Sequence, residues 1–165
     1  MQTKLFKLCY KNIFTMTNEK VLVLIKPDAM AKQLAGIIIH DISQLNLKMV
    51  GLKLVAVKKH LAEKHYEIHK EKPFYSDLVK YILGEFHNIK SIIAIVYEGE
   101  NAINNLREYA GKTNPDDAKP LSLRGRYGKI NSKTKNWDNI MHISDSPENA
   151  EKEIKIWFDE DELVG

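Results

Sequence analysis

Five consecutive apolar residues, Val21–Ile25 (VLVLI), constrain the fold of this chain more than any other feature. A short run without alternation is typical of a strand that is buried on both faces. The run ends at Lys26-Pro27-Asp28, where Pro27 breaks the strand and Asp28 can begin a helix. The sequence therefore predicts an α/β domain in which this strand lies inside a layered core.

The rest of the chain alternates between helical and strand-like spacing of its apolar residues. In the first part of the chain we expect a helix over 31–45, a strand over 48–58, helices over 61–69 and 74–83, and a strand over 89–97. A turn at 98–100 and a helix over 101–110, closed by Gly111, come next. The remainder is a long irregular segment over 112–138, a short strand at 139–141 and a last helix from Ser146-Pro147. This order is compatible with a parallel doubly wound sheet and with an antiparallel βαββαβ sandwich.

Length, charge and cysteine content bound the class of protein. A chain of 165 residues with 44% hydrophobic and 28% charged residues suits one globular domain. A net charge of +3 is too small to indicate nucleic-acid binding, but it suits an anionic small-molecule substrate. No apolar run approaches the roughly 20 residues of a membrane span. The single cysteine, Cys9, cannot form an internal disulfide, which favours a reducing, cytoplasmic compartment.

The two ends of the chain differ from its middle. Residues 1–18 contain lysines and no acid, which suits either a targeting leader or an N-terminal extension with Met16 as an alternative start. We favour the extension, because the segment lacks the arginines of a transit peptide and the apolar core of a secretory signal. We therefore expect an extension over 1–18 and one domain over 19–165. Asp159–Glu162 is expected to be a solvated acidic tail.

His142 is a candidate functional residue because a helix is expected to begin a few positions after it. Ser146 and Pro147 are a hydroxyl cap and a first-turn proline, so His142 is expected on a strand-to-helix turn next to a helix N-terminus, where anions are favoured. Glu153 lies two helical turns beyond Ser146 on the same face, from where its carboxylate can orient the imidazole. An ordinary histidine beside a helix cap is the alternative, and spacing alone favours it.

Six short stretches then resemble, in the same order, the nucleoside diphosphate kinase family. They are LIKPD at 24–28, HY with KPF within 65–74, EGENA at 98–102, TNP at 113–115, LRG at 123–125 and NIMHISDS at 139–146. The resemblance covers residues from about Val21 to Phe158 and implies a ferredoxin-like βαββαβ fold, an antiparallel four-stranded sheet covered by helices. It also implies that the γ-phosphate of a nucleoside triphosphate such as ATP is transferred to a nucleoside diphosphate. The implied route is a ping-pong mechanism through a phosphohistidine, with Mg²⁺, in a hexamer or tetramer.

The resemblance implies roles for individual residues as well. His142 matches the nucleophile, which Ser144 and Glu153 position. The phosphate and ribose ligands match Lys26, Tyr66, Arg107, Thr113, Arg124 and Asn139. Phe74, with Leu78, matches the platform on which the base stacks. Mg²⁺ would be held mainly by the nucleotide phosphates, with Asp145 at most assisting through water, because this ion keeps much of its hydration shell.

The chain departs from the family pattern near these residues. Ile143 replaces the glycine that usually comes after the nucleophile, Arg126 replaces an acid, Leu121 replaces a glycine, and the segment 129–138 is several residues longer than usual. Because Ile143 is β-branched, its backbone must avoid positive φ. These departures motivate two alternatives to an active kinase. One is a nucleotide-binding module without turnover, and the other is a donor that passes phosphate from His142 to a protein.

Overall fold

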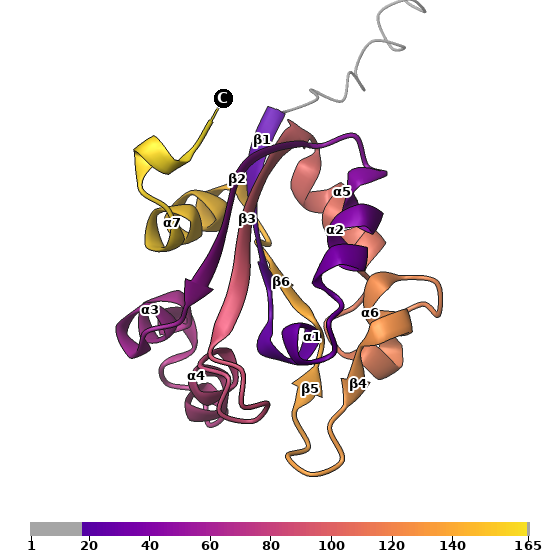
Figure 1. The fold of residues 1–165 in the computed structure, drawn as a ribbon, viewed down its shortest axis with the longest axis vertical. Helices are drawn as coiled ribbons and strands as arrows, with labels where there is room; N and C mark the ends of the chain where they lie inside the picture. Colours follow the sequence, from indigo (N-terminus) through magenta and orange to yellow (C-terminus); the bar gives the residue numbers. More distant parts are fainter. Residues whose placement is uncertain (1–17, 165) are drawn as a thin grey trace, which may run out of the picture.

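Strand β1 (Asn18–Ile25) lies inside a four-stranded sheet in the computed structural model, which describes residues 18–164 (Figure 1). The other strands are β2 (Lys48–Ala56), β3 (Ser91–Glu100) and β6 (Met141–Ile143), and the order across the sheet is β2-β3-β1-β6. Every pair of neighbours is antiparallel. The topology confirms the ferredoxin-like expectation and excludes the parallel doubly wound alternative.

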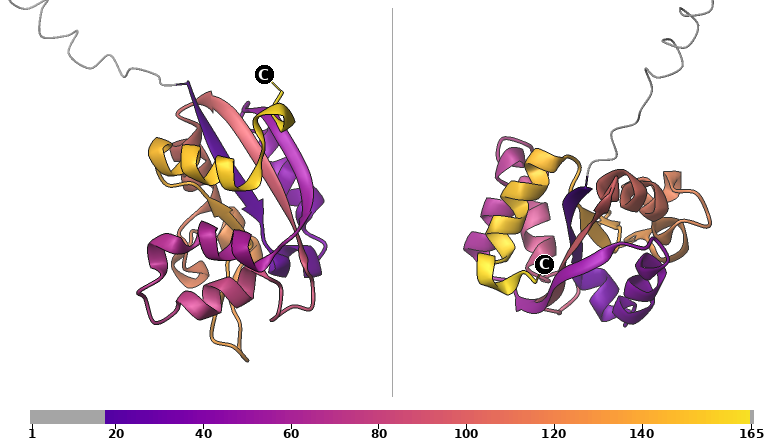
Figure 2. Two further views of the ribbon diagram at one scale, coloured as in Figure 1. Left: turned by 90° about the vertical axis from the view of Figure 1, so that its left-hand side faces the viewer. Right: turned by 90° about the horizontal axis from the view of Figure 1, so that it is seen from above.

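Helices cover both faces of this sheet (Figure 2). The α-helices are α1 (Pro27–Ala31), α2 (Ala35–Ser43), α3 (Lys59–His65), α4 (Tyr75–Ile82), α5 (Ala102–Ala110), α6 (Leu123–Tyr127) and α7 (Pro147–Trp157). Three short 3₁₀ turns are η1 (Glu67–His69), η2 (Pro115–Asp117) and η3 (Glu160–Glu162), and β4 (Lys129–Ile130) pairs with β5 (Trp137–Asp138) in a separate hairpin.

The side chains of β1 alternate between two hydrophobic cores. Val21, Val23 and Ile25 pack with α2 and α5 on one face, whereas Leu22 and Leu24 pack with α3, α4 and α7 on the other. All five side chains are completely buried. The prediction of a strand buried on both faces is therefore confirmed, and β1 becomes the platform from which the site is built.

Several predicted elements have different bounds; the helix expected over 61–69, for example, is divided into α3 and η1. The helix expected over 31–45 is interrupted, because Gln33 adopts a positive φ of 58° between α1 and α2. The turn expected at 98–100 is instead the end of β3, whose Glu100 pairs with Asn18. The chain turns one residue later, at Asn101, which has a φ of 50°. Asparagine tolerates this left-handed conformation better than most residues.

The segment expected to be irregular contains short regular elements, namely η2, α6 and the β4–β5 hairpin. Within residues 112–138, Ser122 caps α6 by accepting a hydrogen bond from the Gly125 N–H, and the β4–β5 hairpin comes next. Arg126, which replaces the family's acid, forms an ion pair of 2.6 Å with Asp41 on α2. The departure from the family pattern is thus matched by a partner within the chain.

The acidic C-terminal segment Asp159–Glu162 is exposed, as expected for a solvated tail, and it is also ordered. Asp159 and Glu162 form a capping box around η3, and Glu162 pairs with Lys53 on β2. Beyond η3, the Val164 N–H donates to the Val50 carbonyl over 2.8 Å. Of the N-terminal extension expected over 1–18, residues 1–17 lie outside the described residues, and Asn18 begins β1.

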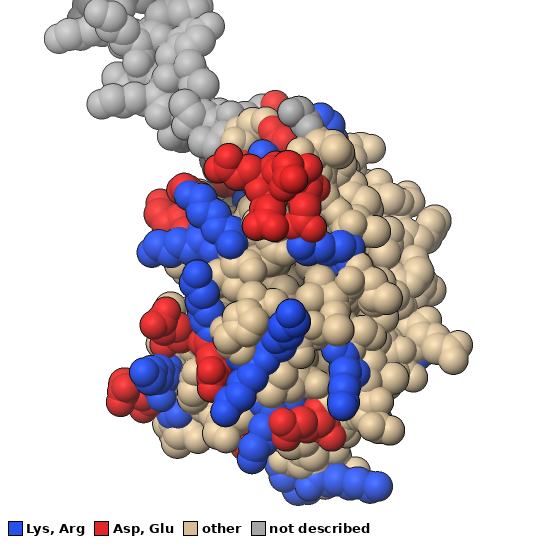
Figure 3. Space-filling view, turned by 60° about the vertical axis from the view of Figure 1, so that its left-hand side comes forward, with Lys and Arg blue, Asp and Glu red and all other residues tan. Residues whose placement is uncertain are grey.

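The described surface gives two further constraints. Within residues 18–164, no helix has the length and apolar character that crossing a bilayer requires. Lysines and arginines are interspersed with acidic side chains on the face that Figure 3 shows, in line with the small net charge.

Candidate active site

His142 lies in the middle of β6, where it pairs with Leu24 of β1. The sequence prediction of a strand at 139–141 with His142 on the next turn was therefore wrong by two residues. The cause is Ile140, which looks like a strand former but has a φ of 62°. Ile143 pairs with Val23 in the same strand, so its backbone avoids positive φ as predicted. A strand backbone holds the imidazole more rigidly than a turn would.

The imidazole of His142 is oriented by a carboxylate from α7. The Glu153 Oε2 atom lies 2.9 Å from the Nε2 atom of His142, and it also accepts a 2.6 Å hydrogen bond from the Ser144 hydroxyl. Ser144 is completely buried, and its oxygen accepts the Leu22 N–H. An ionised carboxylate only accepts hydrogen bonds, so it selects the tautomer with the proton on Nε2. The Nδ1 atom then keeps its lone pair.

Burial and nearby cations keep this histidine neutral. Burial lowers the pKa of His142 to about 3, and the positive charges of Lys26 and Arg124 act in the same direction. Burial raises the pKa of Glu153 above its usual value, although the hydrogen bond from Ser144 opposes that shift. Since only a neutral imidazole has a free lone pair, His142 is in its nucleophilic form at neutral pH.

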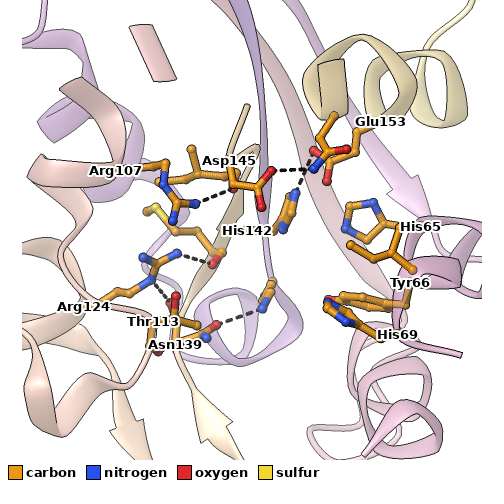
Figure 4. A pocket seen from close by; sticks show the side chains of 15 residues that line it. His65, Tyr66, His69, Arg107, Thr113, Arg124, Asn139, His142, Asp145 and Glu153 are labelled. Atoms are coloured by element: carbon orange, nitrogen blue, oxygen red, sulfur yellow. Dashed lines mark hydrogen bonds and ion pairs between the residues drawn. The ribbon is translucent and has the colours of Figure 1, made fainter. Parts of the chain in front are cut away.

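His142 and Glu153 line a cavity of about 220 Å³ (Figure 4). Most of the predicted site residues line this cavity. They are Lys26, Tyr66, Arg107, Thr113, Arg124, Asn139, His142, Asp145 and Glu153. These residues come from segments more than 100 positions apart in the sequence, and the β1–β6 pairing brings them together.

Asn139 connects three of the predicted phosphate ligands. Its Oδ1 atom accepts a 2.8 Å hydrogen bond from the Lys26 ammonium group, and its Nδ2 atom donates to the Thr113 carbonyl over 3.2 Å. Its own carbonyl accepts from Arg124 Nε over 3.3 Å. Burial lowers the pKa of Lys26 to about 8, while the nearby Asp28 opposes the shift. Lys26 is thus mostly charged at neutral pH but close to its titration range.

Two arginines add positive charge to the same wall. Arg124 is buried and donates to the carbonyls of Gly111 and Met141 over 2.6 and 3.1 Å. These partners are uncharged, so they fix the guanidinium without neutralising it. Burial lowers the pKa of Arg124 to about 10, which leaves it protonated at neutral pH. Arg107 donates a long bond of 3.5 Å to the Ile143 carbonyl.

Tyr66 supplies a neutral donor on the opposite wall. Its hydroxyl is buried and has no hydrogen-bond partner among the described residues. Burial raises the pKa of Tyr66 above its ordinary value, so the phenol keeps its proton. A buried hydroxyl without a partner is costly, and an incoming polar ligand would satisfy it.

The residues predicted to stack with the base, unlike the predicted phosphate ligands, do not line the cavity. Phe74 precedes α4, is 48% exposed, and its ring centroid lies 5.8 Å from that of His69 at the cavity wall. Leu78 packs against the second hydrophobic core. The structure does not bring Phe74 or Leu78 into the cavity lining itself.

Sequence reasoning missed several side chains that line the cavity: His65, Ile68, His69, Met141, Ile143 and Asn149. His65 is the most informative of them, because its ring lies 4.4 Å from the His142 ring at an interplanar angle of 85°. Trp157 donates its indole N–H to His65 Nδ1 over 3.3 Å. The spacing of His65, Ile68 and His69 at i, i+3 and i+4 was the available signal, since it places them on one helical face.

A neutral, carboxylate-oriented histidine that faces a lysine and two arginines defines a phosphotransferase site with a histidine nucleophile. The comparisons with known proteins agree. The family model described as nucleoside diphosphate kinase matches residues 19–163. A nucleoside diphosphate kinase from Staphylococcus aureus is 43% identical over 146 residues, which are 88% of this chain and 91% of that protein.

Solved structures give the same assignment. The nucleoside diphosphate kinase of Aquifex aeolicus superimposes with a TM-score of 0.80 at 34% identity, covering 90% of this chain and 100% of that one. A transition-state mimic of the Borrelia burgdorferi enzyme with bound vanadate and ADP gives 0.81 at 28% identity, covering 92% and 93%. The chain belongs to the nucleoside diphosphate kinase family, whose members transfer phosphoryl groups between nucleoside phosphates.

Proposed function

We propose that this chain transfers the γ-phosphoryl group of a nucleoside triphosphate to a nucleoside diphosphate through a covalent intermediate on His142. The observation that carries the proposal is the 2.9 Å contact between His142 Nε2 and Glu153, which leaves Nδ1 as the free nucleophilic nitrogen. In the first step Nδ1 forms a bond to the γ-phosphorus, and the bond from that phosphorus to the bridging oxygen breaks. The diphosphate leaves with this electron pair. In the second step a terminal oxygen of another diphosphate takes the phosphoryl group, and the P–N bond electrons return to Nδ1.

Charge placement supports this reaction. Phosphoryl transfer requires little covalent chemistry from a protein beyond positioning and stabilisation of charge on the phosphoryl oxygens. Lys26, Arg107 and Arg124 supply positive charge on the cavity wall, and Tyr66 and Thr113 supply hydroxyl donors. We assign Lys26 and Tyr66 to the transferred phosphoryl group. Arg107, Thr113 and Arg124 are assigned to the other phosphates, and Asn139 to the ribose and Lys26.

The donor set fits a magnesium ion held mainly by the substrate. Asp145 and Glu153 are the acidic residues that line the cavity in the described part of the chain, and Glu153 is engaged by His142 and Ser144. Asp145 accepts from Asn149 over 2.7 Å and can still reach a hydrated cation through water. When bound, Mg²⁺ would neutralise part of the negative charge of the phosphates.

Nucleotide recognition at the other end of the substrate is assigned to Phe74. Its ring is about half exposed next to the cavity, and stacking on an exposed ring reads the face of a base rather than its edge. We therefore propose that both purine and pyrimidine nucleotides serve as substrates. The neutral-pH chemistry and the reducing environment suited to Cys9 are compatible with a cytoplasmic enzyme.

Exposed apolar side chains on and near β2 support a homo-oligomer. β2 is at one end of the sheet, and its Leu52 and Leu54 are 51% and 67% exposed. Ile37 on α2 is another exposed apolar side chain. A second copy of this chain would cover these groups and the part of the β2 edge that the C-terminal segment leaves open. Sedimentation of Leu54→Glu should show smaller particles than the unmodified protein. Equal sizes would exclude this edge from the interface, and the choice of hexamer or tetramer stays a prediction.

Initial rates test the covalent route. ATP is varied at several fixed concentrations of a second nucleoside diphosphate, and double-reciprocal plots should give parallel lines because the first product leaves before the second substrate reacts. Intersecting lines would contradict the covalent intermediate. Binding of nucleotide without any transfer would favour the non-catalytic alternative.

A further inference from the structure

A buried polar pair joins two loops behind the cavity. His87 lies between α4 and β3, and its Nε2 atom is 3.1 Å from the Asp138 Oδ1 atom of the β4–β5 hairpin. The two side chains are 11% and 2% exposed. Neither residue lines the cavity, and neither appears in the sequence stretches that resemble the family. A buried carboxylate requires a partner, so this contact fixes how the two loops sit against each other.

The loop that carries His87 has a defined backbone. Gly84 has a φ of 79°, and a Cβ atom there would lie 1.6 Å from the Ile89 carbonyl oxygen. Only glycine fits this close approach. The Gly84 carbonyl also accepts the N–H groups of His87 and Ile89 over 3.2 and 3.3 Å. The position of the His87 ring is therefore set by a tight turn.

Asp138 holds the hairpin at the same time. Its second oxygen, Oδ2, accepts from the side-chain amide of Asn131 over 3.3 Å. Asn131 in turn caps the hairpin turn, because its Oδ1 accepts the N–H groups of Lys133 and Thr134. One carboxylate thus ties the hairpin to the His87 loop.

The residues immediately after Asp138 lead directly into the site. Asn139 binds Lys26, Thr113 and Arg124. Ile140 then adopts its positive φ of 62°, an uncommon conformation for a β-branched residue. Strained backbone persists only where the surroundings fix it on both sides. Its N–H donates to Asp28 Oδ2 and its carbonyl accepts from the Lys26 N–H, both over 2.9 Å. Asp138 is the anchor on the other side.

Tyr81 lies next to both His87 and Lys26. The ring of Tyr81 is 3% exposed and lies between them: its centroid is 5.6 Å from that of His87, and the Lys26 ammonium lies 5.2 Å above the same ring. Asn139 and Tyr81 therefore both contact the Lys26 ammonium. Asn139 follows Asp138 in the sequence, and Tyr81 packs against His87.

We propose that His87 is a positioning residue for phosphoryl transfer: through Asp138 it fixes Asn139, which holds the Lys26 ammonium toward the phosphates. The inference rests on the proposed function and deepens it. It gives the long 129–138 segment a role, since the hairpin ends on the carboxylate that His87 holds.

A double-mutant cycle tests this route. His87→Leu should lower the single-turnover rate of His142 phosphorylation from Mg·ATP roughly ten- to a hundredfold, the effect of displacing a catalytic group slightly. In an Asn139→Ala background the same change should cost less than about twofold, because the residue through which His87 acts is gone. An equal loss in both backgrounds would overturn the proposal and leave His87 a merely structural residue.

Conservative variants keep the test interpretable. His87→Gln retains a donor for Asp138 and should restore most of the rate. If His87→Leu does not fold, because it leaves a buried charge unpaired, the combined His87→Leu/Asp138→Asn variant replaces it in the cycle. Lys53→Met, which breaks the pair with Glu162 far from the site, is the matched control and should leave the rate unchanged.

ADP affinity, measured by calorimetry, separates the two proposals. Should the unmodified protein form no phosphohistidine, the proposed function fails, and the same cycle is evaluated on ADP affinity. Coupling between His87 and Asn139 in ADP affinity would still support the positioning role, whereas additive losses would overturn it.

Discussion

The two ends of the candidate substrate site differ in how firmly the protein holds them. At the phosphate end, His142 is fixed by Glu153, and Glu153 by a completely buried Ser144. At the base end, Phe74 is 48% exposed, and its ring lies against His69 of the cavity wall. Rigid elements, a strand and a long helix, supply the first group, while a short loop before α4 supplies the second.

Under the proposed function, the firmly held phosphate end determines the chemistry, and the exposed Phe74 ring accepts different bases. Phosphoryl groups are the same in every nucleoside triphosphate, so their ligands can be preorganised without loss of generality. Bases differ in their edges, and a single exposed ring contacts only the face that they share. Four experiments test this comparison, three at the phosphate end and one at the base end. Removal of the nucleophile should give the largest effect.

Removal of the nucleophile should separate chemistry from binding. His142→Ala is expected to lower turnover more than ~10³-fold, as loss of a nucleophile does in other enzymes. Nucleotide affinity should change little, because the phosphate ligands remain. Stopped-flow rates and ADP titration provide the two readouts. A variant that keeps its rate would remove His142 from the mechanism.

Disruption of the orienting carboxylate should cost less. In Glu153→Gln the side chain can donate to Nε2, which favours the tautomer with the proton on Nδ1 and so blocks the nucleophile. We expect the rate of phosphorylation to fall roughly 10–100-fold, typical for loss of an orienting partner. Glu151→Gln on the same helix, whose carboxylate pairs with Lys155 at the surface, is the control. Equal rates in the two variants would show that Glu153 does not orient His142.

The pH dependence should report the cation rather than the nucleophile. With its pKa lowered to about 8 by burial, Lys26 loses its charge above that pH, and the phosphorylation rate should then fall about tenfold per pH unit. His142 stays neutral well below pH 6.5, because its pKa is lowered to about 3, so its own protonation should not lower the rate between pH 5 and 7. In Lys26→Arg the alkaline fall should disappear. An unchanged fall in that variant would assign it to another group.

The base end should give the smallest effect. Phe74→Ala is expected to weaken nucleotide affinity about tenfold, from the ~1–3 kcal/mol of stacking on one aromatic ring. Purine and pyrimidine diphosphates should lose similar factors, and the phosphorylation rate at saturation should stay unchanged. Titration of ADP and CDP tests this expectation. A loss confined to one base would show that the protein reads base edges after all.

The sequence predicted those features that depend on local pattern. The apolar run at 21–25 indicated a strand buried on both faces, and the Ser146 cap with Pro147 indicated the start of α7, whose Ser146 hydroxyl accepts the Asn149 N–H. The two-turn spacing from Ser146 to Glu153 then placed a carboxylate toward His142. Each of these inferences uses residues within one or two turns of each other.

Features that depend on tertiary contacts could not be predicted in this way. β6 contains only three residues, too few for a period to be recognised, and the positive φ of Ile140 is held by Asp28, which is 112 positions away. The backbone carbonyls that hold Arg124 and the contact between His87 and Asp138 have no local signal either. Family resemblance supplied the ligand set, but only the structure shows that Asn139 joins Lys26, Thr113 and Arg124.

The central claim, a phosphohistidine on His142, is tested most directly by intact mass. The protein is incubated briefly with Mg·ATP, its mass is measured, and a nucleoside diphosphate is then added. We predict one acid-labile phosphoryl group that maps to His142 and disappears on addition of the diphosphate. A protein that binds ATP but gains no phosphoryl group, or carries it on another residue, would contradict the account.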